Sequence, residues 1–293
     1  MKYISNRMTV LTAVAVIVFM MLPGCGRREA QENSLQIKGS DTMVNLGQAW
    51  AETFMKQDPD ISIAVTGGGS GTGITSLINN TCDIAEVSRE MKEEELRMAR
   101  SRGIDPNEIK VALDGLAVVV NPNNPVSQLT VEELAAIFTG KLKNWQEVGG
   151  NDEKIVILSR EVNSGTHVYF KEHVLRRGNP QSTEEFAPGA LMLPSSQAIA
   201  EEVSQNTAAI GYYGMGYISS KEKAVNIAKD KNSEYVPPKV ENVMNNSYPI
   251  SRPLLMYTKG APAGTVKRFI DFVLSPEGQE IVKKTDFVPV KAI

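Results

Sequence analysis

The chain has 293 residues, with 31 Lys and Arg, 34 Asp and Glu and two His, and a formal net charge of −3 at pH 7. This slightly acidic balance argues against a nucleic-acid-binding protein, which needs a basic surface patch. Two cysteines and two histidines without metal-ligand spacing also argue against a transition-metal site. We therefore expect no nucleic-acid partner, no metal and no cofactor.

Residues 1–24 have the layout of a secretory signal. Lys2 and Arg7 give a short basic start, and Met8 to Leu22 is almost entirely apolar or small. Such a run is too short, and wrongly flanked, to remain as a transmembrane helix. We predict a signal peptide over 1–24.

The signal ends in Leu22-Pro23-Gly24-Cys25, which resembles a bacterial lipobox. In that motif cleavage makes the cysteine the first residue, and its sulfur carries a diacylglycerol. A polar tether is expected over 25–34, so the mature protein would be anchored to a membrane outside the cytoplasm, in the periplasm or at the cell surface. With Cys25 acylated, Cys82 stands alone, and we expect it to be a buried, inert thiol.

The mature chain of about 270 residues is long enough for two lobes. Without Lys2 and Arg7 it has 29 basic and 34 acidic residues, a net charge of −5. Apolar runs alternate with helical patterns, which predicts an α/β fold. Strands are expected over 35–38, 61–66, 83–87, 111–120, 155–158, 208–213 and 254–258.

Three helices have recognisable ends. The first is expected to open at Ser40 or Asp41, both good N-cap residues, and its apolar face makes Trp50 a core residue. A second begins at Thr130, where Glu133 would complete a capping box, and ends near residue 140. A third follows Ser164 and closes with the basic turn 176–178.

Three short stretches share one design: Gly39-Ser40-Asp41-Thr42, the glycine-rich run 67–73, and Arg160 followed by Asn163-Ser164-Gly165-Thr166. Each places glycine and small hydroxyl residues between a strand-like run and a helical pattern. The first turn of a helix has unpaired N–H groups and partial positive charge. Several such turns brought together would form a socket for a small, dense anion.

Two breaker-rich extended stretches, 116–122 and 245–253, are candidate crossings between lobes. If both cross, the first lobe is discontinuous and comprises 35–117 and 252–293, and the second comprises 118–251. Two anion motifs then lie in the first lobe and one in the second, so that a ligand would be clamped from both sides.

Known catalytic and nucleotide motifs do not fit these stretches. In the run 67–73, Thr72 stands where a dinucleotide fingerprint needs its third glycine. The run also lacks the Gly-Lys-Ser/Thr of a P-loop. Ser70 does not fit the Gly-x-Ser-x-Gly of a nucleophile elbow, because position 72 is threonine. Ser164 and His167 are only three residues apart on one predicted helix, without an orienting acid. We therefore expect no enzyme activity.

The motifs together resemble the phosphate-binding lipoproteins of bacterial phosphate ABC importers, within the periplasmic-type (type II) solute-binding proteins. The resemblance covers nearly the whole mature chain. Its carriers are the three stretches above, Asp83-Ile84-Ala85 with Ser88-Arg89, Ala209-Ile210-Gly211-Tyr212, and the run Tyr248 to Leu254. The resemblance implies two α/β lobes joined by a two-segment hinge that close over one phosphate, a monomer, and an ABC permease as partner.

The resemblance also implies roles for individual residues. Arg160 would make a charge-assisted contact to phosphate oxygens, with a surface ion pair to Glu161 or Asp152 as the alternative. The other donors would come from the three turns. They are Ser40, Thr42, Ser70, Ser164, Gly165 and Thr166.

Selectivity would depend on the proton that phosphate keeps near neutral pH and sulfate lacks. One branch of the family has an aspartate where this chain has Arg89, which would either bind the anion or pair with a carboxylate nearby. Asp41 is our candidate for the acceptor of the phosphate proton, with a plain helix N-cap as its alternative.

We interpret the chain as an extracytoplasmic, lipid-anchored protein that captures inorganic phosphate and delivers it to an ABC permease. Binding of sulfate or molybdate is the nearest alternative. A surface hydrolase or phosphatase, and a sensor without a transport role, are more distant ones.

Overall fold

The structure is a computed structural model that describes residues 33–290. The expected signal peptide, Cys25 and most of the expected tether lie outside the described residues. Among the helices of 33–290, none has both the length and the apolar character needed to cross a membrane.

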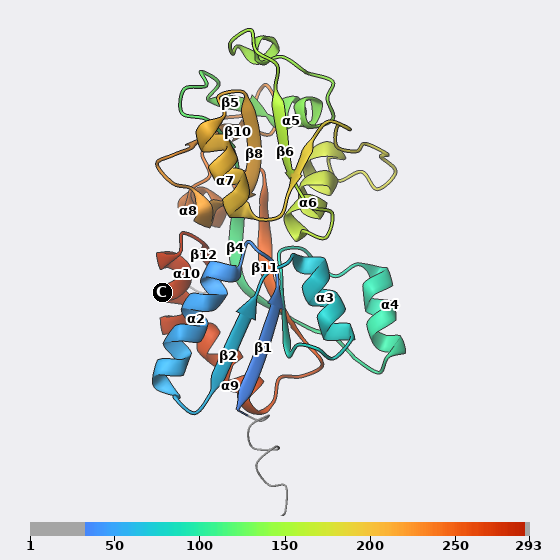
Figure 1. The fold of residues 1–293 in the computed structure, drawn as a ribbon, viewed down its shortest axis with the longest axis vertical. Coiled ribbons are helices and arrows are strands. Elements are labelled where there is room, and N and C mark those ends of the chain that lie inside the picture. Colours follow the sequence, from blue (N-terminus) through green and yellow to red (C-terminus); the bar gives the residue numbers. More distant parts are fainter. Residues whose placement is uncertain (1–32, 291–293) are drawn as a thin grey trace, which may run out of the picture.

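The molecule has two lobes stacked along its long axis and joined by strands β4 and β11 (Figure 1). The first lobe contains β1 (Ser34–Gly39), α2 (Val44–Gln57), β2 (Ser62–Thr66), α3 (Ser70–Ile78), β3 (Ile84–Val87), α4 (Glu93–Ser101), α9 (Gly264–Val273), α10 (Pro276–Lys284) and β12 (Val288–Pro289). The joining strands are β4 (Asn107–Val120) and β11 (Ser251–Thr258).

The second lobe is made from the middle of the chain. Its strands are β5 (Gln128–Thr130), β6 (Val156–Arg160), β7 (Leu191–Leu193), β8 (Ala209–Gly214), β9 (Lys223–Ala224) and β10 (Asn226–Ala228). Its helices are α5 (Val131–Phe138), α6 (Gly165–Phe170), α7 (Ser196–Gln205) and α8 (Val240–Met244), with 3-10 turns at 145–148 and 215–217 and a π-helix at 171–175.

One continuous sheet runs through both lobes in the order β2-β1-β3-β11-β4-β8-β6-β7. Strands β1, β2 and β3 are parallel, whereas β11 runs antiparallel to β3 and β4. Strand β4 pairs with β11 up to Gly115 and with β8 from Leu116 onward. The change of partner in the middle of β4 therefore marks the passage from one lobe to the other.

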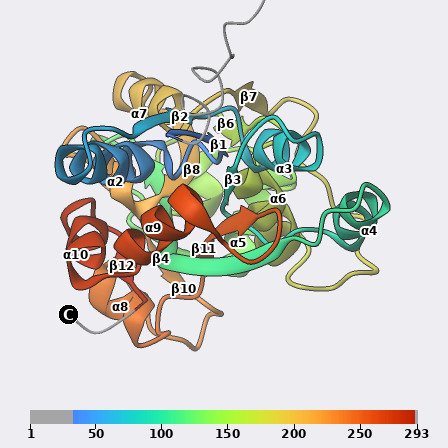
Figure 2. The ribbon, with the colours of Figure 1, turned by 90° about the horizontal axis from the view of Figure 1, so that it is seen from below.

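Helices cover the sheet of the first lobe on both faces, with α2, α9 and α10 on one side and α3 and α4 on the other (Figure 2). Trp50 of α2 is fully buried and its indole Nε1 donates to the Gly278 carbonyl of α10 at 2.8 Å. The predicted core role of Trp50 is confirmed. In the second lobe, Phe170 stacks on Tyr212 with ring centroids 3.9 Å apart.

All seven expected strands are present, and the capping box of Thr130 and Glu133 is confirmed. The predicted start of the first helix at Ser40 or Asp41 is wrong, because α2 begins at Val44 with Met43 as N-cap. The Ser40 N–H instead donates to the Glu86 carbonyl of β3 at 2.7 Å. The turn 39–42 is thereby held against the sheet as a separate loop before the helix.

Candidate functional site

The three predicted turns meet where the two lobes touch. Thr42 of the first lobe and Thr166 of the second share a hydrogen bond between their hydroxyls at 3.0 Å. The Ser40 hydroxyl donates to Ser88 Oγ at 3.0 Å, and Ser70 Oγ lies 3.3 Å from Ser88 Oγ. The structure thus brings hydroxyls from positions between 40 and 166 into one buried group, here called the hydroxyl cluster (Ser40, Thr42, Ser70, Ser88, Ser164 and Thr166).

Helix starts border the hydroxyl cluster. Ser70 opens α3, whose N-cap Gly69 has no side chain to satisfy the first N–H groups. Ser164 is the N-cap of α6, and its Oγ accepts from the N–H groups of Thr166 and His167. Because a hydroxyl has two acceptor sites and one donor, the Ser164 O–H stays available to donate. Gly165 must be glycine, since a Cβ there would overlap the Ser70 hydroxyl.

Arg160 ends β6 and is almost completely buried, at 1% exposure. Its Nη2 contacts Asp41 Oδ2 of the first lobe at 2.6 Å, and its Nη1 donates to Ser196 Oγ at 3.1 Å. The alternative of a surface pair with Glu161 or Asp152 is therefore wrong. Asp41 also accepts from the Gly68 N–H at 3.0 Å, so this carboxylate links Arg160 to the glycine-rich loop.

A second arginine, Arg252, was missed by the sequence analysis as a site residue. It stands opposite Asp114 in the register of β11 and β4, and both side chains are buried. Nε and Nη2 of Arg252 bind Asp114 Oδ2 at 3.0 and 2.8 Å. Nη2 also donates to the hydroxyls of Thr42 and Thr166, at 3.3 and 3.0 Å. The guanidinium of Arg252 thus lies against the hydroxyl cluster at the junction of the lobes.

The Arg252–Asp114 pair is deeply desolvated. Burial raises the pKa of Asp114, and the neighbouring Arg252 charge opposes this rise. Breaking such a buried pair by removing one partner costs about 3–5 kcal/mol, since a charge is left without compensation. The signal for Arg252 in the sequence was its position in the breaker-rich run 245–253, whose last residues form the start of β11.

Arg89 forms an ion pair inside the first lobe. Its Nη1 and Nη2 bind the two carboxylate oxygens of Glu95 at 2.8 and 2.7 Å, and Nη1 donates to the Glu90 carbonyl. Burial tends to raise the pKa of Glu95, but the hydrogen bonds from Arg89 and the charge of its guanidinium lower it overall. Of the two roles left open for Arg89, pairing with a nearby carboxylate is the arrangement in the structure.

Glu86 is a buried carboxyl just behind the turn 39–42. It is fully buried, and neither carboxyl oxygen has a hydrogen-bond partner within residues 33–290. Gly47 of α2 leaves room for this carboxyl, because a Cβ at Gly47 would overlap it. Burial raises the pKa of Glu86 well above its ordinary value of 4.5, which favours the neutral form of the carboxyl.

His167 lies beside the hydroxyl cluster but faces the interior of the second lobe. Its Nδ1 lies 3.3 Å from Ser159 Oγ, and Ser159 in turn contacts the Tyr212 hydroxyl at 2.7 Å. Burial lowers the pKa of His167 to about 4, so the ring is neutral near pH 7. The ring therefore contributes no charge to the site, and its side-chain partner is Ser159 and not Ser164.

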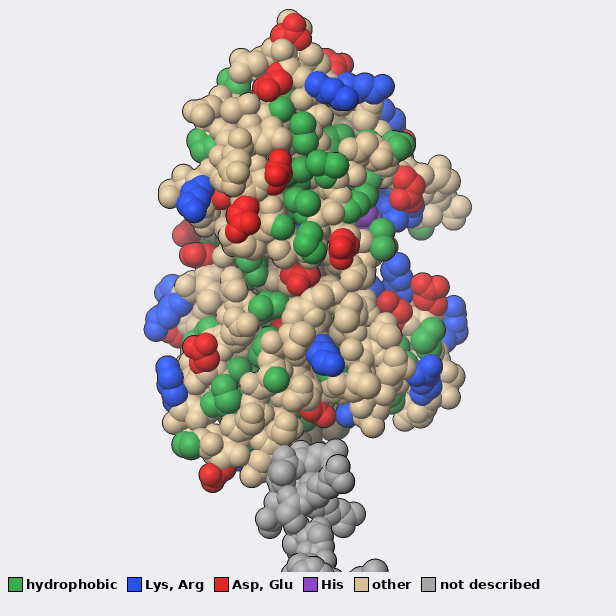
Figure 3. Space-filling view, viewed as in Figure 1, with side chains coloured by type: hydrophobic (Ala, Val, Ile, Leu, Met, Phe, Trp, Pro, Cys, Tyr) green, Lys and Arg blue, Asp and Glu red, His purple; other side chains and the backbone are tan. Residues whose placement is uncertain are grey.

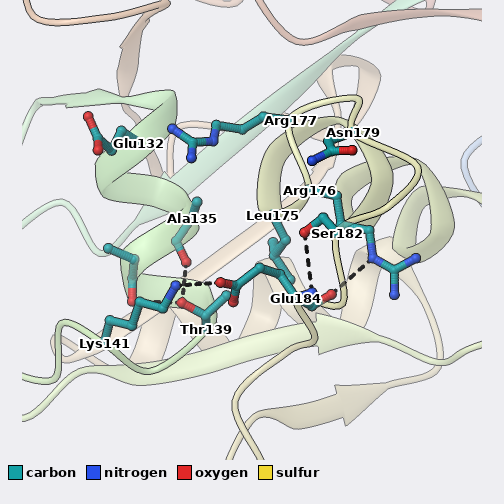
Figure 4. A pocket seen from close by; sticks show the side chains of 11 residues that line it. Glu132, Ala135, Thr139, Lys141, Leu175, Arg176, Arg177, Asn179, Ser182 and Glu184 are labelled. Atoms are coloured by element: carbon teal, nitrogen blue, oxygen red, sulfur yellow. Dashed lines mark hydrogen bonds and ion pairs between the residues drawn. The ribbon is translucent and has the colours of Figure 1, made fainter.

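Two open cavities lie away from the hydroxyl cluster. One of about 400 Å³ is bounded by α5 and the segment after the π-helix, where the Lys141–Glu184 ion pair spans its wall (Figure 4). Another, of about 470 Å³, is lined by Arg89 to Lys92, by Tyr169 and His173, and by the start of β11. Neither cavity contains a residue of the hydroxyl cluster.

On the face in Figure 3, acidic and basic side chains are interspersed over both lobes. In residues 33–290, no group of three or more His, Cys, Asp or Glu side chains is placed to hold a metal ion.

Comparison with known proteins agrees with this architecture. Residues 27–277 match the model of the PBP superfamily domain. The phosphate-binding protein PstS of Pseudomonas aeruginosa is 32% identical over 288 residues, covering 92% of this chain and 87% of that protein. PstS of Bacillus subtilis is 35% identical over 270 residues, with 89% and 82% covered.

A solved relative gives the same result at the level of structure. The chain is similar to a protein from Clostridium perfringens that is proposed to be a phosphate ABC transporter substrate-binding protein and was crystallised with bound phosphate. The two share 37% identity at a TM-score of 0.79, covering 88% of this chain and 100% of that one.

The two-lobed α/β fold, with its polar group buried where the lobes meet, is that of a PBP-superfamily protein, and this chain belongs to that superfamily. Within it, the chain belongs to the family of the PstS phosphate-binding proteins. The resemblance inferred from the sequence motifs is confirmed.

Glu86 gives a testable dependence of stability on pH. The folded chain binds the Glu86 proton more tightly than the unfolded chain, which releases it above about pH 4.3. Stability is therefore lost as the pH rises from that value toward the folded-state pKa. We expect the melting temperature of Glu86→Gln to rise relative to that of the unaltered protein as the pH is raised from about 5 to about 8.

The control for this measurement is Glu94→Gln, since Glu94 is exposed on α4. Its melting-temperature difference from the unaltered protein should stay flat over the same range. A flat difference for Glu86→Gln as well would show that Glu86 is ionised in the folded protein.

Proposed function

We propose that this chain captures inorganic phosphate in the hydroxyl cluster and delivers it to an ABC permease, making and breaking no bond. The observation that carries the proposal is the meeting of three donor turns and two arginines at the junction of the lobes. The relatives are named phosphate-binding proteins, and one solved relative holds phosphate. A phosphate-sized anion would be bound by hydroxyl and backbone N–H donors from both lobes.

The proposed ligands are those expected from the sequence with the exception of Arg89, together with Ser88 and Arg252. Hydroxyls of the cluster and N–H groups at the starts of α3 and α6 would donate to the phosphate oxygens. Arg160 and Arg252 would add charge-assisted contacts, although each is already paired with an aspartate. Arg89 would have no direct part, since both of its Nη atoms bind Glu95.

We propose that the lobes comprise 35–117 with 252–293 and 118–251, and that β4 and β11 act as the hinge. Donors from both lobes surround the anion only when the lobes are closed, so phosphate would shift the population toward the closed form. The permease would recognise that closed form.

The first experiment is calorimetric titration of the mature protein with phosphate, sulfate and molybdate, after carried ligand has been removed by unfolding and refolding. We expect tight one-to-one binding of phosphate, with a smaller radius of gyration in solution scattering. Thr166→Val, which keeps shape but loses the hydroxyl, should weaken phosphate about 10- to 100-fold, the loss typical of a hydrogen bond to a charged group.

The matched control is Thr53→Val on α2, whose hydroxyl donates to the Ala49 carbonyl and makes no other hydrogen bond within residues 33–290. Phosphate affinity should be unchanged by this variant. Preference of the unaltered protein for sulfate or molybdate would mean that the site binds a different oxyanion, and turnover of a phosphate ester would mean an enzyme.

Asp41 is proposed to accept the proton of phosphate and so to discriminate against sulfate. Its carboxylate is 16% exposed and already accepts from Gly68 and Arg160, but each oxygen has a further acceptor site. Asp41→Asn should reduce the ratio of phosphate to sulfate affinity by about tenfold or more, because an amide NH₂ can donate to sulfate. Titration of both anions measures this ratio, and an unchanged ratio would remove Asp41 from selectivity.

We further propose that Cys25 carries the lipid that anchors a monomer outside the cytoplasm. Its support is the lipobox-like ending of residues 1–24. In bacteria expressing the full chain, Cys25→Ala should abolish incorporation of labelled fatty acid and release the protein from the membrane fraction. Cys82→Ala, which removes a buried thiol, is the control and should leave labelling intact. Membrane retention of Cys25→Ala would contradict lipid anchoring at this residue.

A further inference from the structure

The two lobes also touch each other outside the hydroxyl cluster. The Asn163 side-chain Nδ2, from the second lobe, donates to the Gly68 carbonyl of the glycine-rich loop at 2.8 Å. In the reverse direction, the Gly71 N–H donates to the Asn163 carbonyl at 2.9 Å. Asn163 is thus bound to the opposite lobe through both its side chain and its backbone, although it is itself exposed.

The glycines of this loop are suited to the contact with Asn163. A Cβ on Gly69 would lie 2.8 Å from the Asn163 carbonyl oxygen, and one on Gly71 would lie 3.2 Å from it. Gly69 also has a φ of +92°, which L-residues with side chains rarely adopt. At these two positions the absence of a side chain lets the backbone of the other lobe approach.

A second hydrogen bond between the lobes involves the backbone of Asp41. The Tyr217 hydroxyl, from the 3-10 turn after β8, donates to the Asp41 carbonyl at 2.6 Å. Burial, with a smaller contribution from Asp41, raises the pKa of Tyr217 to about 12, so this hydroxyl keeps its proton and stays a donor. The bond uses the backbone of Asp41 and leaves its carboxylate to Arg160 and Gly68.

We infer that Asn163 and Tyr217 form a latch, in which protein-to-protein hydrogen bonds hold the lobes closed and set how slowly bound phosphate leaves. The latch consists of Asn163 with Gly68 and Gly71, and Tyr217 with Asp41. Its effect on phosphate release rests on the proposed function, whereas its effect on lobe closure does not. Neither side chain belongs to the hydroxyl cluster, so the latch acts as a positioning device and not as an anion ligand.

The latch has a specific kinetic consequence. Its bonds form only on closure, so the free energy that they contribute is absent from the open form in which an anion enters. Loss of one bond should therefore speed phosphate dissociation and leave association nearly unchanged. It should also lower the fraction of closed protein before any phosphate is added, because the bonds do not involve the ligand.

The test uses the purified mature protein with its lipid anchor in detergent, and the variants Asn163→Ala and Tyr217→Phe. A dye pair is attached through Glu52→Cys on α2 and Glu201→Cys on α7, both exposed positions on different lobes. Energy transfer between the dyes then reports lobe closure with and without inorganic phosphate, and stopped-flow displacement gives the dissociation rate. Each variant should open the phosphate-free protein and speed dissociation about three- to tenfold, the range expected for one hydrogen bond.

The matched control is Asn151→Ala, since Asn151 is exposed on the second lobe and its side chain makes no hydrogen bond within residues 33–290. It should leave both readings unchanged. Melting curves identify a variant that fails to fold, and the other variant then carries the test. Wild-type closure and dissociation in both latch variants would overturn the inference. A shift in phosphate-free closure without phosphate binding by any form would support the latch and refute the proposed function.

Discussion

The buried ion pair between Arg252 and Asp114 is the interaction on which the junction of the lobes depends. The two residues face each other across β11 and β4, the strands that connect the lobes, and neither is exposed. The same guanidinium reaches a threonine from each lobe. An ion pair so placed couples the joining strands of the sheet to the hydroxyl cluster, because movement of either alters the contacts of the other.

Charge balance follows from this arrangement. Arg252 and Arg160 bring two positive charges to the site, and Asp114 and Asp41 bring two negative charges. Glu86 adds no charge while its carboxyl keeps its proton. The cluster is therefore close to neutral before an anion arrives, and an anion would be held mainly by oriented hydroxyl and N–H dipoles. Dipoles fixed in a buried site discriminate by geometry and by proton content, which excess positive charge would not do.

The sequence was sufficient to predict the fold class and the location of the site, since both depend on local patterns. Small hydroxyl and glycine residues between strand and helix patterns identified all three turns, and the structure places them together. Arg252 could not be recognised in this way, because its threonine partners lie 210 and 86 residues away. The helix start was mispredicted for a related reason. Ser40 has the local preference of an N-cap, but its N–H is taken by the Glu86 carbonyl of a neighbouring strand.

Asp41 shows why selectivity and closure are difficult to separate in this molecule. Its two carboxylate oxygens bind Arg160 and the Gly68 N–H, and its carbonyl accepts from Tyr217. Two of these three partners, Arg160 and Tyr217, belong to the second lobe, so opening of the lobes would remove two of the three contacts that hold Asp41. A carboxylate fixed by closure offers its remaining acceptor sites in a defined direction only then. Discrimination by Asp41 would consequently act on the closed complex, and an anion that could not satisfy Asp41 would be released by reopening before delivery.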